Sequence, residues 1–308
     1  MECLVTGGAG FVGSHLIERL LIDNHSVVCL DDFSTGKRKN LDDIKNEIKI
    51  IKGDIQNPDI IRKAVKNIDY IFHLAAQISV NRSVRDPQFD AAVNIGGTIN
   101  LLEAMNNSSI KRFIYMSTGG AIYGEPTSIP APETTKEDPI SPYGISKLTA
   151  ERYLHWFHRT YGLSYSIIRP ANIYGPRQDP LGEAGVISIY LGRIKNNEPL
   201  DIFGDGTDTR DYVYVTDIAD ICIKVMNSKD IETFNAGTGI QTNLLDLIKI
   251  IEEVTKINAR KRFCDSRPGD VNHISLDSSK ALEILGWRAN TDMFSGIKKT
   301  WDWFMTNH

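Results

Sequence analysis

Thr-Gly-Gly-Ala-Gly-Phe-Val-Gly occupies residues 6–13, directly after an apolar run at residues 3–5 and at the start of an amphipathic stretch. Gly7 permits a tight turn, Gly10 lets the backbone come close to a pyrophosphate, and Gly13 lets a helix pack closely on a sheet. The backbone N–H groups at the start of that helix attract anions. The segment therefore predicts a strand, a turn and a helix that bind the phosphates of a dinucleotide.

Beyond this turn, short apolar runs alternate with longer amphipathic stretches, a pattern typical of a parallel sheet with crossover helices. The apolar runs predict strands at residues 3–5, 27–30, 48–51, 70–74, 113–116 and 165–168. The amphipathic stretches predict helices at residues 11–21, 89–105 and 142–161. The expected fold class is α/β, with a Rossmann-type doubly wound parallel sheet.

A change of composition marks the predicted domain boundary, because residues 169–185 are rich in proline and glycine. Shorter helices and strands follow, and an apolar run returns at residues 212–226. We therefore predict a dinucleotide-binding domain over residues 1–170, with a return to it around residues 212–230. A smaller mixed α/β lobe that binds the substrate is expected over residues 171–308.

Asp31 is predicted to select the dinucleotide. It ends the second predicted strand, 18 residues after Gly13. A carboxylate at this place accepts hydrogen bonds from both hydroxyls of an adenosine ribose and repels a 2′-phosphate. The expected cofactor is therefore NAD rather than NADP.

The bulk composition gives no sign of a nucleic-acid or membrane partner. The formal net charge is −4 at pH 7, and no apolar run approaches the ~18 residues that span a bilayer. The four cysteines lack metal-site or redox-motif spacing, and His155 and His158 have no third ligand nearby, so no metal site is expected. Free thiols and a start without a targeting segment favour the cytoplasm.

The chemistry is predicted to lie at residues 141–147, which read Ser-Pro-Tyr-Gly-Ile-Ser-Lys and begin the third predicted helix. Tyr143 and Lys147 are four residues apart, so they share one helical face with β-carbons about 5–6 Å apart. A cation about 4 Å from a phenolate is worth roughly 4 kcal/mol at an effective dielectric constant of about 20. We therefore expect Lys147 to lower the pKa of Tyr143 toward neutrality, so that Tyr143 acts as a general base.

With this glycine spacing and the Tyr143/Lys147 pair, the chain resembles the extended short-chain dehydrogenase/reductase family over essentially its whole length. The resemblance implies a bound NAD that is recycled within each turnover. It implies the following contacts with NAD: Gly7, Gly10, Phe11, Val12, Gly13, Asp31, Asp32, Thr35, Gly36, Asp54, Ile55, Leu74, Ala75, Ala76, Asn94, Ser117, Tyr143, Lys147 and Pro170.

The sequence departs from the family at the third catalytic residue. The family has a serine or threonine four residues before the tyrosine of a Tyr-Gly pair, which here is Tyr123-Gly124. The corresponding position is Gly119, which has no hydroxyl. We predict that Thr118, the nearest hydroxyl, takes the role, and we expect Gly119→Ser to be tolerated.

The same segment narrows the reaction that the resemblance implies. Related 4,6-dehydratases carry Thr-Asp-Glu here, because loss of water needs an acid and a second base, whereas this chain reads Thr-Gly-Gly at residues 118–120. The expected activity is epimerisation at carbon 4 of UDP-glucose or UDP-galactose through a transient 4-keto sugar. The alternatives are a UDP-N-acetylhexosamine or UDP-uronic acid 4-epimerase, a UDP-glucuronate decarboxylase, and an NAD-sensing binding protein.

Segments of the second lobe resemble the family's sugar-nucleotide site. Guanidinium groups suit a diphosphate because they contact its oxygens in pairs. The residues implied to bind the substrate are Asn172 at the diphosphate or sugar, Phe203 beside the uracil, Arg210 and Arg267 on the diphosphate, Asp270 on the ribose, and Ile274 next to carbon 2 of the sugar.

The resemblance also implies a homodimer formed through a helix bundle. Each subunit would contribute the predicted helices at residues 89–105 and 142–161. The second of these carries Leu148, Tyr153 and Trp156 on more than one face, which exceeds what a single core contact needs.

Overall fold

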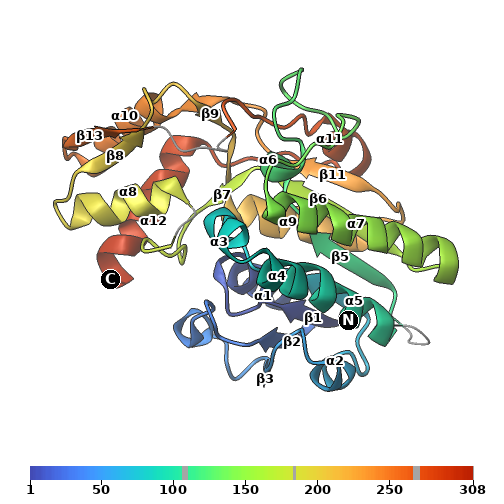
Figure 1. The fold of residues 1–308 in the computed structure, drawn as a ribbon. Helices are drawn as coiled ribbons and strands as arrows, with labels where there is room; N and C mark the ends of the chain where they lie inside the picture. The colour runs from blue at the N-terminus through green and yellow to red at the C-terminus, as the bar shows by residue number, and fades with distance from the viewer. Residues whose placement is uncertain (106–109, 183–184, 266–270, 308) are drawn as a thin grey trace.

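Seven parallel strands form the central sheet of the computed structural model, which describes residues 1–105, 110–182, 185–265 and 271–307 (Figure 1). The strand order is β11-β6-β5-β4-β1-β2-β3, and it reverses direction at β1 and β4. This reversal is the doubly wound arrangement, so the predicted fold class is confirmed. The strands are β1 Glu2–Thr6, β2 Ser26–Asp31, β3 Lys49–Lys52, β4 Tyr70–His73, β5 Arg112–Met116, β6 Tyr165–Pro170 and β11 Thr233–Ala236.

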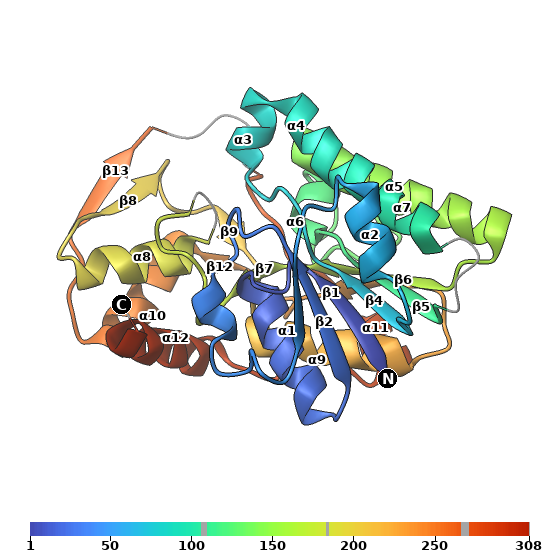
Figure 2. The same ribbon diagram turned by 90° about the horizontal axis from the view of Figure 1, so that it is seen from below.

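Helices cover both faces of this sheet (Figure 2). One face packs against α1 (Phe11–Ile22) and α9 (Val215–Asn227). The other face packs against α2 (Pro58–Ala64), α5 (Gly97–Met105) and α7 (Pro142–Tyr161). Because the inner strands are covered on both faces, β1, β2, β4 and β5 are buried and mostly apolar rather than alternating, whereas the edge strand β3 has exposed lysines at both ends.

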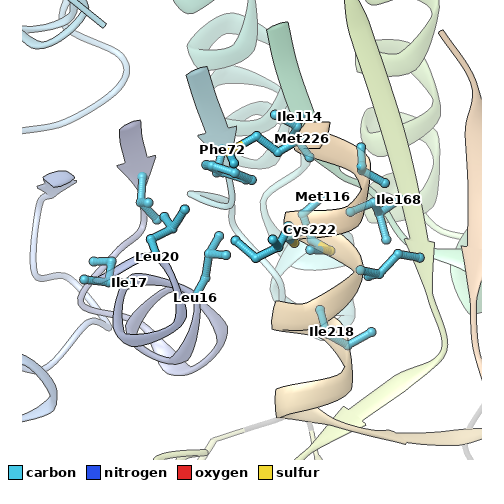
Figure 3. Close-up of a cluster of buried hydrophobic side chains, with 14 of the residues drawn as sticks. Leu16, Ile17, Leu20, Phe72, Ile114, Met116, Ile168, Ile218, Cys222 and Met226 are labelled. Carbon is cyan, nitrogen blue, oxygen red and sulfur yellow. The ribbon is translucent and has the colours of Figure 1, made fainter. Parts of the chain in front are cut away.

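The contact between α1 and α9 shows how the apolar face is built. Leu16 and Leu20 of α1 and Cys222 of α9 are fully buried, and they meet side chains such as Phe72 of β4 (Figure 3). Figure 3 also shows Ile168 of β6 on the far side of α9 from α1. Residues from the second half of the chain therefore complete the core that the first half begins.

Two of the long predicted helices differ in regularity. The helix predicted at residues 142–161 is α7 with the predicted bounds; the Ser141 hydroxyl accepts a hydrogen bond from the Gly144 N–H at 3.2 Å, and Gly162 ends the helix in the left-handed conformation. The helix predicted at residues 89–105 is instead three consecutive segments: α4 Pro87–Ala91, a π-helical turn Ala92–Gly96, and α5. A short helix, α3 Val80–Arg85, precedes them.

The second lobe packs short two-stranded sheets and helices around its own buried cluster, which includes Tyr190, Leu191 and Leu247. Its strands are β7 Asn172–Tyr174, β8 Leu200–Phe203, β9 Thr209–Arg210, β10 Tyr212–Tyr214, β12 Thr242–Asn243 and β13 Lys261–Cys264. Its helices are α8 Val186–Lys195, α10 Leu244–Thr255 and α12 Met293–Asn307. The remaining helical segments are the 3₁₀ turn Arg38–Leu41, α6 Gly119–Ile122 and α11 Ser279–Leu285.

The chain passes between the two lobes more than once. α9 packs on α1, β11 pairs with β6 in the central sheet, and Ala281 of α11 also lies in the cluster beneath that sheet. The domain division at residue 170, with a return around residues 212–230, stays a prediction from the sequence. None of the helices in the described ranges is long and apolar enough to cross a membrane.

Candidate functional site

The parallel strands bring many of the predicted site residues to one edge of the sheet. Strand β1 leads into the glycine turn, β2 ends at Asp31, β5 leads to Thr118, and β6 ends at Pro170. All these strands run in the same direction, so their carboxyl ends share one edge. In doubly wound folds, the ligand binds outside this edge where the strand order reverses.

The glycine turn has no room for side chains. Gly7 has φ +69°, and a Cβ there would lie 2.8 Å from the Ala75 backbone nitrogen. A Cβ at Gly13 would collide with the carbonyl oxygen of Gly7. Gly10 caps α1 without a side-chain hydrogen bond, and the first turn of α1 holds no acidic residue. The N–H groups of that turn can therefore receive a pyrophosphate, and the site fits a dinucleotide.

Asp31 is held in place by the backbone on either side of it. Its carboxylate accepts hydrogen bonds from the Ala9 N–H at 2.9 Å and the Phe33 N–H at 2.8 Å. Burial raises the pKa of Asp31, and the two N–H groups oppose this rise. A Cβ at Gly36 would lie 2.6 Å from one of the carboxylate oxygens. Each oxygen keeps a second lone pair, which a ribose hydroxyl can use.

The segment after β4 and the π-helical turn meet behind this edge. The N–H groups of Leu74 and Ala75 donate to the carbonyl and hydroxyl oxygens of Thr6, each at 3.2 Å. The buried Asn94 side chain bonds to both backbone groups of Gln77 and to the hydroxyl of Ser146 on α7. Asn94 therefore ties the cofactor segment to the helix that carries Tyr143.

Other predicted cofactor residues have protein partners of their own. The carboxylate of Asp32 accepts from Ser34, and that of Asp54 accepts from Gln56. The Ser117 hydroxyl donates to Glu151 at 2.6 Å, and Ile55 is packed in the core beneath α5. The rest are placed as follows: Thr35 is exposed, Phe11, Val12, Gly36 and Ala76 are partly buried, and Pro170 is buried.

Thr118 lies near Tyr143, and Lys147 follows Tyr143 by one turn of α7, but the electrostatics of Tyr143 and Lys147 differ from the expectation. Burial raises the pKa of Tyr143 to about 12, and the neighbouring Thr118 side chain opposes this rise. The Lys147 ammonium donates to the Met116 carbonyl oxygen at 2.6 Å and lies 4.5 Å from the centre of the Tyr115 ring. Burial lowers the pKa of Lys147 to about 7, against the attraction of Glu151 and Asp90.

The expected depression of the Tyr143 pKa by Lys147 is therefore wrong for the protein alone. Desolvation disfavours the charged form of both groups, and it outweighs the effect of Thr118 on Tyr143 and of Glu151 and Asp90 on Lys147.

A buried ion pair connects α7 to the end of β6. The guanidinium of Arg169 contacts both carboxylate oxygens of Glu151 at 3.0 and 2.6 Å, and the side chains are 3% and 1% exposed. Arg169 also donates to the Tyr123 hydroxyl at 3.0 Å, and that hydroxyl donates to Asn235 of β11 at 2.8 Å. The sequence analysis did not include this pair, although Glu151 follows Lys147 by one helical turn and so shares its face.

The predicted substrate residues lie on or near the strands of the second lobe. Asn172 is exposed on β7, and Phe203, partly buried, ends β8. The Arg210 guanidinium donates to the carbonyls of Thr209 and Asn272 at 2.9 and 3.2 Å. Arg267 and Asp270 lie outside the described residues.

Ile274 and Gly119 belong to one buried contact region. Ile274 is 4% exposed and clusters with Ile122, Ala131 and Leu276. A Cβ at Gly119 would lie 2.9 Å from Leu276 Cδ2. The expectation that Gly119→Ser is tolerated therefore conflicts with the structure, because Leu276 already fills the space.

The described residues hold no group of three His, Cys, Asp or Glu side chains suited to a metal ion.

Residues 3–237 match the model of the NAD dependent epimerase/dehydratase family. The chain belongs to this family. Its membership confirms the resemblance to extended short-chain dehydrogenases, and with it the expectations of an enzyme and of NAD as the cofactor. The glycine turn and Asp31 are the features of this structure that fit NAD.

Curated and solved relatives are similar over nearly their full length. The UDP-glucose 4-epimerase of Mycolicibacterium smegmatis is 42% identical, covering 99% of this chain and 98% of the relative. The UDP-glucose 4-epimerase of Thermotoga maritima, solved with UDP-glucose, is 43% identical with a TM-score of 0.96, covering 99% of both chains. A UDP-N-acetylglucosamine 4-epimerase from Methanobrevibacter ruminantium, solved with UDP-N-acetylmuramic acid, is 36% identical with a TM-score of 0.95, covering 100% of this chain and 99% of the other.

The buried Lys147 makes folding stability depend on pH. The pKa of Lys147 is about 7 in the folded chain, below its ordinary value of 10.5, so the unfolded chain binds more protons between these pH values. The contribution of Lys147 to stability therefore rises with pH from about 7 to 10.5. We expect the stability of Lys147→Met relative to the parent, from denaturant unfolding at several pH values, to fall over this window.

Lys147→Arg is the matched control, because an arginine stays charged throughout this range. Its stability relative to the parent should also fall, since the parent loses its buried charge and the variant does not. A stability difference for Lys147→Met that does not change with pH would contradict the assignment.

Proposed function

We propose that the chain catalyses the NAD-dependent epimerisation of UDP-glucose and UDP-galactose at carbon 4. The observation that carries the proposal is the nearness of Thr118 to Tyr143, with Lys147 one turn further along α7, in a segment where Gly119 and Gly120 supply no carboxylate. Dehydration would need an additional acid and base there. The names of the 42% and 43% identical relatives support the same reaction.

In this proposal, Tyr143 exchanges a proton with the hydroxyl on carbon 4. Thr118 holds the phenol and the sugar hydroxyl in line through its own hydroxyl, and Lys147 stabilises the phenolate when it is charged. NAD supplies the hydride acceptor and donor, so no net oxidation results. The keto sugar must rotate in the site between the two hydride transfers, so that its opposite face meets the cofactor. This requires contacts that hold the diphosphate but do not fix the sugar ring.

The second lobe is proposed to provide those contacts. Arg210 is held by the Thr209 and Asn272 carbonyls, so its guanidinium can meet a diphosphate without a loss of side-chain freedom. Asn172 would contact the diphosphate or sugar and Phe203 the uracil. Arg267 and Asp270 complete the proposed set.

We also propose that the enzyme works in the cytoplasm, as part of galactose metabolism, without a nucleic-acid or membrane partner. The net charge of −4 offers no general attraction for polyanions. Cys3, Cys29, Cys222 and Cys264 are all free thiols, which suits a reducing compartment.

The direct test is an assay with UDP-galactose and no added reductant, in which UDP-glucose should form. Tyr143→Phe keeps the ring but cannot exchange a proton, so turnover should fall by about 10² to 10⁴ while the melting temperature and NAD content stay close to the parent. The parent and Tyr143→Phe are compared by coupled detection of UDP-glucose. Turnover of Tyr143→Phe within threefold of the parent would refute the role of Tyr143.

The substrate range is predicted to include an N-acetyl group at carbon 2. Ile274 is smaller than the tyrosine expected in epimerases restricted to plain hexoses, so UDP-N-acetylgalactosamine should react detectably but less well than UDP-galactose. A change of one or a few methylene groups in a pocket discriminates roughly 10 to 200-fold. Ile274→Tyr should abolish the N-acetyl activity and spare the other, measured as kcat/KM on both substrates.

Because Ile274 is 4% exposed and clusters with Ile122 and Leu276, a larger side chain could also disturb packing. Ile274→Leu keeps nearly the same volume and serves as the control. An equal loss of both activities in Ile274→Tyr, with Ile274→Leu unaffected, would show that residue 274 is a packing residue only.

The enzyme is further proposed to be a homodimer through the outer face of α4, α5 and α7, which lie side by side in Figure 2. Trp156 is 47% exposed there, next to a depression lined by Thr149, Arg152 and Tyr153. We expect a dimer at micromolar concentration by sedimentation, and Trp156→Glu should shift it to the monomer. Phe294→Glu, at an exposed aromatic residue of α12, is the control that should leave the dimer intact.

A further inference from the structure

Leu276 occupies the place that a side chain at residue 119 would take. A Cβ built on Gly119 would lie 2.9 Å from Leu276 Cδ2 and 3.2 Å from its Cγ, and closer still to Cδ1. Real Cβ atoms do not approach neighbouring atoms to less than 3.0 Å. The packing of Leu276 therefore gives a steric reason for a glycine at position 119, in addition to the loss of the hydroxyl there.

The side chain of Leu276 is enclosed on its other sides. It is fully buried, in a cluster with Ile122, Tyr123, Ala131 and Ile274. A well-packed interior resists displacement, so Leu276 cannot swing aside without disturbing these neighbours.

The backbone of Leu276 is also fixed. Its N–H donates to the buried carboxylate of Asp211 at 3.2 Å. The same carboxylate accepts from the Thr238 N–H, the Thr238 hydroxyl and the Gly239 N–H at 3.0, 2.6 and 3.0 Å. On either side of Leu276, Ser275 and Asp277 form backbone hydrogen bonds with Ala131 at 2.8 and 3.0 Å.

The two positions beside Gly119 differ from it. Thr118 is the N-cap residue of α6 but makes no capping hydrogen bond, and its side chain lies near enough to the Tyr143 hydroxyl to act on the pKa of Tyr143. At Gly120, a Cβ would meet no heavy atom within 4 Å among the described residues. Of the two glycines, Gly119 therefore has no space for a side chain, whereas Gly120 has.

We infer that Leu276 is a positioning residue that decides which hydroxyl pairs with Tyr143. By filling the space beside Gly119, it excludes a side chain from position 119 and leaves Thr118 as the partner. The catalytic part of this inference rests on the proposed epimerase function, whereas the packing part does not.

The packing part is tested by thermal unfolding of the full chain with NAD present. Gly119→Ser should lower the melting temperature by roughly 3 °C or more, and Gly120→Ser, the matched control, by less than about 1 °C. Leu276→Ala alone should also lower it, because it leaves a cavity. The double variant Gly119→Ser/Leu276→Ala should lose clearly less than the sum of the two single losses, since the serine enters the space that leucine vacates. Additive losses would overturn the inference.

The catalytic part is tested by a rescue experiment with UDP-galactose. Thr118→Ala should lower kcat about tenfold or more, and adding Gly119→Ser should not restore it. Adding Leu276→Ala as a third change should raise kcat at least about threefold above Thr118→Ala, with KM little changed. Replacing Gly119→Ser by Gly120→Ser in that triple variant should give no rescue.

Three results would overturn the inference: a Thr118→Ala enzyme as active as the parent, recovery by Gly119→Ser without the change at Leu276, or a triple variant no more active than Thr118→Ala. If the parent epimerises no UDP-sugar, the proposed function fails. The melting temperatures still decide whether Leu276 excludes a side chain from position 119.

Discussion

The ion pair between Glu151 and Arg169 is the interaction on which the arrangement of the site depends. It is almost fully buried, and its two charges come from different elements, α7 and β6. Breaking such a pair leaves an uncompensated charge in the interior, at a cost of about 3–5 kcal/mol. The pair therefore fixes the helix that carries Tyr143 and Lys147 to the strand from which the chain enters the second lobe. Through Tyr123 and Asn235 the same network reaches β11.

Desolvation is the second constraint, and it determines what the site can do alone. Burial lowers the pKa of Lys147 to about 7 and raises the pKa of Tyr143 to about 12, so near neutral pH Tyr143 is neutral and Lys147 is divided between its charged and neutral forms. A pair in this state does not deprotonate an alcohol by itself.

Much of the fold could be predicted from the sequence because strong local signals lie close together. The glycine turn, the apolar runs and the caps of α7 are local features, and they gave six strands, the first helix and the bounds of α7. The strand β11 was missed because its four residues, Thr-Phe-Asn-Ala, carry no continuous apolar run, and its place in the sheet depends on pairing with β6. The π-helical turn was missed because its sequence continues an ordinary helical pattern; Asn94 bonds with Gln77 and Ser146 only in the folded chain.

In the candidate site, too, local features could be predicted from the sequence and long-range contacts could not. Spacing alone placed Tyr143 and Lys147 on one helical face, and it pointed to Thr118 as the nearest hydroxyl. Spacing could not show the sign of the pKa changes, because that sign depends on burial by residues far away in the chain. Nor could it show Leu276 against Gly119, a contact between residues 157 positions apart.

The return of the chain to the central sheet has a consequence for synthesis on the ribosome. α1 is the first helix to be made, yet its packing partner α9 and the edge strand β11 emerge only after residues 215–236. Until then, the apolar side of α1 and the open edge of β6 remain without their native cover. Such surfaces and edges are what chaperones bind and what drives aggregation of incomplete chains. The nascent chain thus completes the core between the sheet and α1 and α9 late, and an early release of a shortened product leaves that face of the sheet uncovered.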